Sequence, residues 1–404
     1  MLETAQTLIK RAAKKLGIGN SEVKKLLKPD AEHIFEIELK NGQKCKAFRV
    51  QHSHKLGPYK GGIRFHPSVN LDEIRALALL MNLKTAAVGL PMGGAKGGAR
   101  VDPKKLSQAE LEELSRKYVD YLAPYIGPDK DIPAPDVNTN AKIIDWMVDE
   151  YQKLTGDKSK ASFTGKSLNN GGSLGRTAAT GRGGVIALSK LLLLQGLTLE
   201  HKRDQNMTFA VQGFGNVGSY FATIAEKDQP NWKLVAASDS SATVYASHGL
   251  DAKDLAKFKK SGGHFSDYQK VKTLSSDEII GLKVDVLVLA ALEDAVTDKN
   301  MKQVKAKYIV EMANGPVNLA ANDYLTSQGI TILPDIIANA GGVIVSYLEW
   351  LQNRKNEHWS EAKVNKKLED YMVKTVNKLY KTAKTEKTSL TEAAFLLALK
   401  RLTS

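Results

Sequence analysis

The chain has 404 residues, 42% of them apolar, which suffices for two hydrophobic cores because single cores stop growing at roughly 250 to 300 residues. Lysines and arginines outnumber acids by 58 to 44, a net charge of +14, which favours anionic partners. The only cysteine, Cys45, excludes an intrachain disulfide and a thiolate zinc site, and the histidines show no metal-ligand spacing, so we expect no metal.

The N-terminal segment is typical of a surface helix, because Leu2, Ile9 and Leu16 recur at helical spacing. It lacks the apolar core of a secretory signal, and no stretch of the chain reaches the roughly 18 apolar residues of a membrane span. We expect a cytoplasmic protein with no membrane partner. The positive residues are dispersed and form no RNA-binding or zinc-finger motif, so we also expect no nucleic-acid partner.

The first half begins with a predicted β-hairpin. Two alternating stretches within residues 33–54 flank the pair Asn41-Gly42, which predicts antiparallel pairing in the sheet of the first domain. The segment GPYKGGIRF then places Lys60 between a tyrosine and a glycine pair. A helix is predicted from about Leu71, with one stripe formed by Ile74, Leu77, Met81, Lys84 and Val88.

Three lysines, Lys60, Lys84 and Lys96, lie close together in this half, each beside glycine or on an apolar stripe. Taken alone, Lys84 is better explained as a lysine that reaches solvent at a helix C-terminus and complements the helix dipole. Buried lysines placed together repel unless an anion is present. We interpret the set as a site for an anionic substrate, in which two lysines hold carboxylates and a third, with a lowered pKa, acts as an acid/base.

Lys96 is surrounded by glycines in LPMGGAKGGAR, which indicates that backbone, ligand or both come unusually close to it. The segment DIPAPDVNTN offers a complementary carboxylate, Asp136, which Pro133 and Pro135 would hold stiffly ahead of a helix. Asp136 is alternatively part of the turn that caps this helix, for which three other residues are equally good candidates: Asn138, Thr139 and Asn140. The inward face of the helix is expected to carry Ile143, Ile144, Met147, Val148 and Tyr151.

A glycine-rich stretch, residues 164–184, joins the two halves. Two readings stay open here. It is a bare linker, or it is a hinge and the wall of a ligand cleft with Thr180 and Arg182 near a cofactor.

The second half contains a glycine turn between an apolar strand and a helix. The run from Met207 to Val211 is followed by six residues that we expect to bind a dinucleotide: Gly213, Phe214, Gly215, Asn216, Val217 and Gly218. Gly213 would allow the tight turn, Gly215 the approach of the pyrophosphate, and Gly218 close packing of the helix. A second strand ends at an acid, Asp239, which completes the dinucleotide-binding fingerprint.

Further apolar runs near residues 284–292, 307–313 and 330–335 predict a doubly wound parallel sheet. The loops that leave its strands make Asn314 and Asn339 candidates for the nicotinamide side, although each is alternatively a turn residue. Asp239 could accept from the adenosine ribose hydroxyls and repel a 2′-phosphate, whereas Ser240 and Ser241 could accommodate that phosphate. We therefore expect NAD or NADP, with a mild preference for NAD.

The ordered motifs resemble the hexameric type of glutamate dehydrogenase, within the Glu/Leu/Phe/Val dehydrogenase superfamily. The motifs are GPYKGGIRFHPSVNLDE, LPMGGAKGG, IPAPDVNT, GGSLGRTAATGRGG, VQGFGNVG, EMANGP and ANAGGVIVSYLEW, and they span nearly the whole chain. The resemblance implies reversible oxidative deamination of L-glutamate to 2-oxoglutarate and ammonium. It implies that Lys96 is catalytic and that Asp136 moves protons at the substrate nitrogen.

The same resemblance assigns substrate-binding roles. Lys84 would bind the α-carboxylate, Lys60 and Ser346 the side-chain carboxylate, and Asn339 would also lie on the substrate. Met312 and Val317 depart from the family pattern, where glycine and threonine are expected, and this puts cofactor preference in doubt.

The resemblance also implies an α/β architecture of three segments. Residues 1–178 would form a substrate and oligomerisation domain, residues 179–345 a Rossmann-like doubly wound dinucleotide domain, and residues 346–404 helices that return to the first domain. The last segment keeps helical spacing through Val364, Leu368, Met372, Val376 and Leu379. A homohexamer is expected.

Two alternatives remain at this point. A leucine- or phenylalanine-type dehydrogenase would share Lys84, Lys96 and Asp136 but carry an apolar residue in place of Lys60. A non-catalytic nucleotide- or nucleic-acid-binding protein would explain the positive charge without the lysine set.

Overall fold

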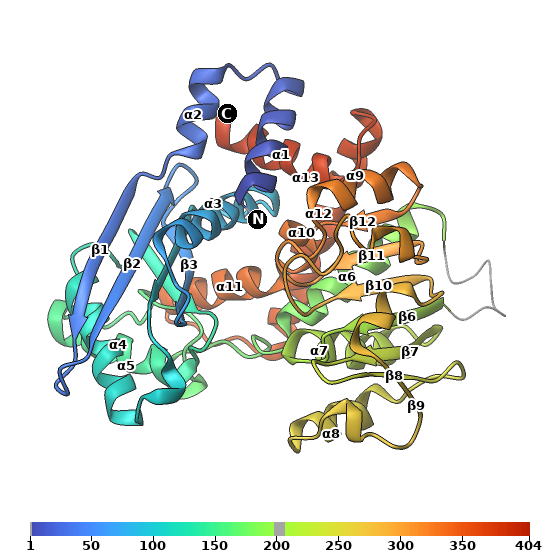
Figure 1. The fold of residues 1–404 in the computed structure, drawn as a ribbon. Coiled ribbons are helices and arrows are strands. Elements are labelled where there is room, and N and C mark those ends of the chain that lie inside the picture. Colours follow the sequence, from blue (N-terminus) through green and yellow to red (C-terminus); the bar gives the residue numbers. More distant parts are fainter. Residues whose placement is uncertain (1, 198–206) are drawn as a thin grey trace. The chain divides into compact units, whose positions relative to one another are not determined.

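The computed structural model describes residues 2–197 and 207–404, which form two compact units (Figure 1). The first unit comprises residues 2–176, 343–367 and 398–404, and the second comprises residues 177–342 and 368–397. Each has its own sheet. Within the described residues, none of the helices combines the length and the apolar character that crossing a membrane requires.

The first unit is built on a mixed five-stranded sheet in the order β1-β2-β4-β3-β5. Its strands are β1 (Ala31–Glu38), β2 (Lys44–Ser53), β3 (Tyr59–Phe65), β4 (Gly94–Ala99) and β5 (Asp131–Pro135). The predicted hairpin is confirmed, because β1 pairs antiparallel with β2 and Gly42 takes the left-handed backbone of the turn, with φ 83°. By contrast, β3 runs parallel to both β4 and β5.

Helices cover both faces of this sheet. The described helices of the unit include α1 (Leu2–Lys15), α2 (Asn20–Leu27), α3 (Leu71–Ala87), α4 (Gln108–Leu122), α5 (Ala141–Thr155) and most of α11 (Gly341–Lys355). Apolar residues of α4 and α5 form one core with the strands, and α3 packs on the opposite face through Ile74 and Ala78. The predicted start of α3 is confirmed, although Met81 on its stripe is only half-buried. The inward face predicted for α5 is confirmed.

The second unit contains a seven-stranded sheet in the order β12-β11-β10-β6-β7-β8-β9. Its strands are β6 (Met207–Gln212), β7 (Trp232–Ser238), β8 (Thr243–Tyr245), β9 (Lys272–Leu274), β10 (Val286–Leu289), β11 (Tyr308–Glu311) and β12 (Thr331–Leu333). The five strands from β12 to β7 are parallel, as predicted, whereas β8 and β9 add antiparallel pairs at one edge. Figure 1 shows these strands side by side in the sheet.

The strands that follow β6 in the chain, β7 to β9, lie on one side of it, and β10 to β12 lie on the other side. The direction in which strands are added therefore reverses between the neighbours β6 and β10. In open α/β sheets, ligands bind at the carboxyl ends of the strands at this point of reversal. Within its described residues up to 340, the α-helices of the unit are α6 (Ala179–Leu194), α7 (Asn216–Asp228), α8 (Ala252–Lys260), α9 (Leu319–Ser327) and α10 (Asp335–Ala338).

The C-terminal helices α12 (Glu361–Thr385) and α13 (Leu390–Thr403) group differently from the expectation that they return to the first domain. Residues 368–397 belong to the second unit, and only residues 343–367 and 398–404 group with residues 2–176. The physical reason is packing. Gly183 of α6 lies against Met372 on the apolar stripe of α12, and Asn322 of α9 donates to Thr391.

Candidate active site

Lys96 lies on β4 and forms an ion pair with Asp136, which directly follows β5. The Lys96 Nζ to Asp136 Oδ2 distance is 3.0 Å, and Arg64 on the intervening strand β3 donates from Nε to the same oxygen at 2.7 Å. Arg64 also donates to Glu73 of α3 at 2.5 Å. Three neighbouring strands therefore bring one carboxylate between two cations, and Arg64 is a member of the site that sequence patterns did not single out.

The charges of this cluster shift the pKa values of its members. Burial lowers the pKa of Lys96 below its usual range, and the neighbouring carboxylate of Asp136 opposes this effect. Burial on its own would raise the pKa of Asp136, but the charges of Lys96 and Arg64 outweigh it and hold that pKa well below the usual range. Asp136 is therefore ionised at neutral pH.

The capping alternative for Asp136 is not supported by the geometry, because Asn140 is the N-cap of α5 and accepts from the Ile143 amide. Asp136 instead turns its carboxylate toward Lys96 and contributes backbone groups to the turn: its amide donates to Thr139 Oγ1 at 2.7 Å, and its carbonyl accepts from the Thr139 amide. The carboxylate is thus reserved for the two cations.

The glycines around Lys96 have a different cause from the approach of a ligand that we expected. A Cβ added at Gly93 would lie 1.9 Å from the Ser53 carbonyl oxygen, and one at Gly94 would lie 2.3 Å from the Asn82 amide nitrogen. The corresponding distances are 2.2 Å to Tyr118 Oη for Gly97 and 2.7 Å to the Arg64 carbonyl oxygen for Gly98. These glycines let neighbouring strands, α3 and α4 approach β4, so close packing of protein on protein explains them.

Lys60 lies on β3 and is 1% exposed. Its Nζ donates to the Ile132 carbonyl at 3.1 Å, and no carboxylate forms an ion pair with it among the residues that the structure describes. Burial, followed by the charges of Arg49 and Arg176, lowers its pKa to about 7, against the opposing effect of Glu349 and Asp131. Lys60 is a buried amine whose charge lacks a paired anion.

Lys60 and Lys96 belong to adjacent strands whose backbones touch, because a Cβ at Gly61 would lie 1.6 Å from the Ala95 carbonyl oxygen. Lys84 lies in the last turn of α3 and is 9% exposed, so it does not extend into solvent as a surface lysine would. The same helix packs on β4 where Asn82 meets Gly94. The structure therefore gathers the three predicted lysines on β3, β4 and the helix that covers them.

Ser346 on α11 is buried and shares a 2.6 Å hydrogen bond with the hydroxyl of Thr164. Glu349, one turn further along α11, accepts from the Gly165 amide at 2.9 Å and from Lys166 Nζ at 2.7 Å. These contacts hold residues 164–166 against α11. The bare-linker reading of residues 164–184 is therefore wrong, because the stretch begins with buried, bonded residues and its end lies within α6.

A second buried ion pair supports the sheet beside Lys60. The guanidinium of Arg49 on β2 donates from Nε to Asp131 Oδ2 at 2.9 Å and from a terminal nitrogen to Oδ1, and both side chains are fully buried. Gln51 donates to the same carboxylate at 2.9 Å. Arg49 also donates to the Gly61 carbonyl, so the pair fixes the strand that carries Lys60.

In the second unit, the glycine turn follows β6 beside the first residues after β10. Gly213 has φ 87°, and an added Cβ there would lie 2.7 Å from Ala291 backbone atoms. A Cβ at Gly218 would lie 2.1 Å from the Gly213 carbonyl oxygen, which shows how closely α7 packs on the turn. At Gly215 an added Cβ would meet nothing within 4 Å. Space for a ligand is therefore found at this one glycine of the three.

The start of α7 is suited to an anion. Its N-cap, Gly215, supplies no side-chain acceptor, so the first-turn amides are not capped by that residue. Asn216 donates from Nδ2 to the Thr177 carbonyl at 3.5 Å, which places the residues just before α6 beside the start of α7. Thr180 lies in the first turn of α6 and is half-buried. These groups fit the phosphates of a dinucleotide.

Arg182 is not brought to the turn. Its guanidinium pairs with Asp228 at 3.2 Å, and Asp228 is the last residue of α7, roughly 18 Å along the helix from the glycine turn. The sequence predicts that Arg182 lies near the cofactor, and this stays a prediction; its guanidinium is bound at the end of α7 that lies away from the glycine turn. Its neighbour Gly181 shows why α6 runs this way, because a Cβ there would lie 2.6 Å from the Phe221 amide in the middle of α7.

Asn314 and Asn339 meet beyond the carboxyl end of β11. Asn339 donates from Nδ2 to Asn314 Oδ1 at 3.1 Å and to the Ala313 carbonyl at 3.0 Å. Neither residue has the left-handed backbone that a turn role would exploit. Both candidates therefore lie together on the ligand-binding edge of the sheet.

Asp239 follows β7 and is held tightly by protein donors. Its Oδ1 accepts from Ser241 N, Ser241 Oγ and Ala242 N, and its Oδ2 accepts from Lys259 Nζ at 2.5 Å and Phe265 N at 3.0 Å. Burial alone would raise the pKa of Asp239, but these hydrogen bonds, above all that from Lys259, hold it well below its usual range. Ser240 beside it is exposed.

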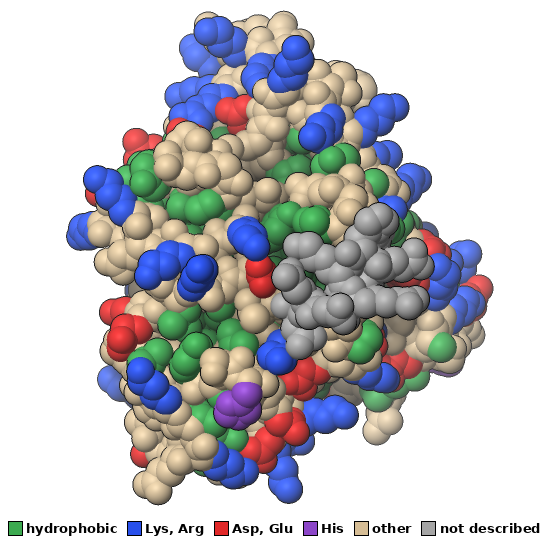
Figure 2. All heavy atoms as spheres, turned by 90° about the vertical axis from the view of Figure 1, so that its right-hand side faces the viewer, with side chains coloured by type: hydrophobic (Ala, Val, Ile, Leu, Met, Phe, Trp, Pro, Cys, Tyr) green, Lys and Arg blue, Asp and Glu red, His purple; other side chains and the backbone are tan. Residues whose placement is uncertain are grey.

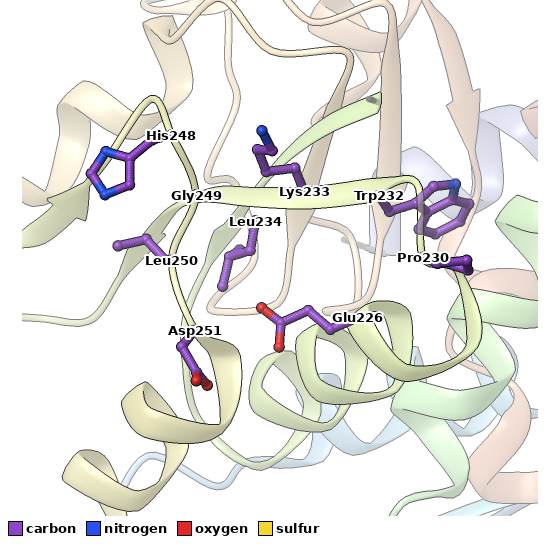
Figure 3. A pocket seen from close by; sticks show the side chains of 9 residues that line it. All are labelled: Glu226, Pro230, Trp232, Lys233, Leu234, His248, Gly249, Leu250 and Asp251. Carbon is purple, nitrogen blue, oxygen red and sulfur yellow. The ribbon is translucent and has the colours of Figure 1, made fainter. Parts of the chain in front are cut away.

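A separate cavity of about 380 Å³ lies near the opposite end of β7 (Figure 3). It is lined by Glu226, Pro230, Trp232, Lys233, Leu234, His248, Gly249, Leu250 and Asp251. Leu234 is roughly 16 Å along the strand from Asp239, so this cavity is distinct from the carboxyl-end site.

The face in Figure 2 shows positive side chains scattered among acidic ones, in keeping with the dispersed charge of the sequence.

Comparison with known proteins follows the same division of the chain. The family model described as Glutamate/Leucine/Phenylalanine/Valine dehydrogenase matches residues 171–404, and the model for the Glu/Leu/Phe/Val dehydrogenase dimerisation domain matches residues 29–153. The chain is 40% identical to an NAD-specific glutamate dehydrogenase of Clostridioides difficile over 100% of this chain and 96% of that protein. It is 41% identical to a glutamate dehydrogenase of Thermotoga maritima, again over 100% and 96%.

Solved structures give the same result. A hetero-hexameric glutamate dehydrogenase from Thermus thermophilus, in a Leu-bound form, aligns with a TM-score of 0.91 and 34% identity over 99% of this chain and 94% of that one. The glutamate dehydrogenase of Peptoniphilus asaccharolyticus aligns with a TM-score of 0.84 and 38% identity over 99% and 96%.

Proposed function

The chain belongs to the Glu/Leu/Phe/Val dehydrogenase family, and from this premise we propose that it catalyses the reversible, NAD(P)-dependent oxidative deamination of L-glutamate to 2-oxoglutarate and ammonium. The observation that carries the choice of glutamate is Lys60. A buried ammonium with no paired carboxylate among the described residues suits a substrate with a second, side-chain carboxylate. An apolar side chain at this position would suit leucine or phenylalanine instead.

The substrate-binding roles that we propose are those that the family resemblance implies, and the burial of these side chains supports them. Lys60 and Ser346 bind the side-chain carboxylate, and the hydroxyl of Thr164 orients Ser346. Lys84, buried at the C-terminal turn of α3, binds the α-carboxylate. Two carboxylates at fixed separation then position the α-carbon and its amino group.

Lys96 and Asp136 carry out the proton transfers. Burial lowers the pKa of Lys96, so its ammonium gives up a proton more readily, and as the neutral amine it would take the proton from the water that adds to the imine carbon of the oxidised substrate. Asp136 is ionised and lies 3.0 Å from Lys96. It accepts protons from the substrate nitrogen and returns them, so that the nitrogen leaves as ammonia. Arg64 holds Asp136 in position through its 2.7 Å bond.

The second unit binds the dinucleotide, which supplies the hydride acceptor when bound. Residues 213–218 and Thr180 are suited to its phosphates, and the open space at Gly215 supports this assignment. Asn314 and Asn339 are suited to the nicotinamide end, because they meet at the carboxyl edge of the sheet. Asn339 also keeps the substrate-binding role that the family resemblance implies.

For the assembly we propose a homohexamer. The match of residues 29–153 to a dimerisation domain and the hexameric relative from Thermus thermophilus support an oligomer. Sedimentation of the purified chain would give its size.

An absorbance assay at the reduced nicotinamide band tests the proposed activity. The intact protein should reduce dinucleotide with L-glutamate and do so far less with L-leucine or L-phenylalanine. Lys96→Ala should lose turnover by roughly a thousandfold or more while keeping its circular dichroism, whereas Lys105→Ala, at an exposed lysine, should be unaffected. Activity with leucine and none with glutamate, or near-normal turnover of folded Lys96→Ala, would contradict the proposal.

A further inference from the structure

The carboxylate of Asp239 has no remaining capacity to bind a ribose. A carboxylate offers about four acceptor positions, and five protein donors already converge on this one. Its side chain is 9% exposed. An acid at this position usually accepts from the ribose hydroxyls and discriminates against a 2′-phosphate by charge. Here both capacities are reduced, because the acceptors are filled and the charge is paired.

The pairing residue, Lys259, is built into the site. It lies near the end of α8, where its Nζ donates to Asp239 Oδ2 at 2.5 Å and to the Gly263 carbonyl at 2.7 Å, and it lies 5.2 Å from the centre of the Phe265 ring. Two of its three ammonium protons are thereby used, and within the part of the chain that the structure describes the third has no acceptor. The Lys259 side chain is 22% exposed, more than the carboxylate that it covers.

This arrangement adjoins the glycine turn. The Gly213 and Phe214 amides both donate to the Ser238 carbonyl, at 3.0 and 2.8 Å, so the residue before Asp239 is fastened to the turn. The ring of Phe214 lies 5.6 Å from that of Phe265. The Lys259–Asp239 pair is therefore continuous with the proposed dinucleotide site.

We propose that Lys259, by neutralising Asp239 and offering its own ammonium, makes the adenosine end of the cofactor site tolerant of a 2′-phosphate, so that the protein binds NADP as well as NAD. The proposal rests on the proposed dinucleotide site. The exposed hydroxyl of Ser240 lies beside the pair and can donate to a phosphate oxygen, whereas the hydroxyl of Ser241 already donates to Asp239. A phosphate dianion entering here would find the Lys259 ammonium and the Ser240 hydroxyl, beside a carboxylate that is 9% exposed and whose charge is paired.

The test is to measure the binding of NADH and of NADPH to the full-length protein, in the absence of glutamate, by the change in nucleotide fluorescence. The unmodified protein should bind the two nucleotides with dissociation constants within about tenfold of each other. Lys259→Gln removes the ammonium and restores an unpaired charge on Asp239, so it should weaken NADPH by roughly ten- to a hundredfold and leave NADH unchanged or tighter. Lys259→Arg should retain most of the NADPH affinity.

The matched control is Lys260→Gln, which makes the same charge change at the exposed neighbouring lysine and should leave both affinities unchanged. If Lys259→Gln merely unfolds the loop, the affinities for NADH and NADPH should fall together, and this result would overturn the proposal. The proposal would also be overturned if the unmodified protein bound NADPH over a hundredfold more weakly than NADH. If neither nucleotide binds, the dinucleotide site itself is wrong. If both bind without glutamate oxidation, only the proposed activity fails.

Discussion

Lys60 should make the binding of a dicarboxylate depend on pH in the neutral range. Its pKa in the free protein is about 7, below the ordinary lysine value of 10.5. A carboxylate beside it stabilises the charged form, so ligand binding requires the protonated amine. Because the pKa is lowered, the amine is charged below pH 7 and increasingly neutral above it. Affinity should therefore be highest on the acid side and fall as pH rises.

The size of the effect follows from the pKa of about 7. About nine tenths of Lys60 is protonated at pH 6 and about one tenth at pH 8. The dissociation constant for 2-oxoglutarate should therefore rise about tenfold from pH 6 to pH 8, or about 1.4 kcal/mol. At pH 8 binding should take up about 0.9 proton per ligand, compared with about 0.1 at pH 6. Both carboxylates of the ligand stay ionised over this range.

Isothermal titration calorimetry in buffers of different ionisation enthalpy measures both quantities at once. The matched control is 2-oxopentanoate, which has the same chain length and 2-oxo acid end but no distal carboxylate. Any titration of Lys84 or Lys96 affects both ligands, so the difference between them isolates Lys60. Equal proton uptake for the two ligands, or an affinity for 2-oxoglutarate that is flat from pH 6 to pH 8, would refute the reasoning.

Two predictions concern the packing that supports the site. Gly94→Ala would place a Cβ 2.3 Å from the Asn82 amide nitrogen and displace α3, so the free energy of unfolding measured in urea should fall by about 1 to 3 kcal/mol. The control is Gly281→Ala, whose Cβ would have its nearest contact at 3.7 Å and should cost under about 1 kcal/mol. Equal losses in the two variants would contradict the packing argument. Asp131→Asn leaves the buried guanidinium of Arg49 uncompensated and should cost about 3 to 5 kcal/mol. The double variant Arg49→Met, Asp131→Leu should recover part of this loss, and no recovery would show that the ion pair is not its source.

The sequence predicts the elements of this fold where the signal is local. The hairpin around Asn41-Gly42, the stripe of α3 and the strand-turn-helix at Gly213 each depend on neighbours within a few residues, so periodicity and turn chemistry suffice. The lysine set was also found, because each lysine breaks a local rule by lying beside glycine or on an apolar face.

The sequence does not reveal the buried ion pairs, because their partners are distant in the chain. Arg49 and Asp131 are separated by 82 residues, and Lys166 and Glu349 by 183. Nothing in the sequence near one residue of a pair indicates which residue is its partner. Glycines raise a different problem. Gly94 and Gly215 look alike in sequence, yet Gly94 accommodates a helix backbone and Gly215 faces open space. Only the three-dimensional neighbours distinguish packing from ligand access.

Lys60 differs from the neighbouring buried cations that form ion pairs. Burying a cation is costly unless an anion compensates it, and the first unit compensates Arg49 with Asp131, Lys166 with Glu349 and Lys96 with Asp136. Burial, followed by the charges of Arg49 and Arg176, lowers the pKa of Lys60 to about 7, and Glu349 and Asp131, which form no ion pair with it, oppose this shift only in part. A substrate carboxylate would therefore gain more at Lys60 than at a lysine that already has a partner. On the proposed function, selectivity for a second carboxylate would arise from the unpaired charge of Lys60.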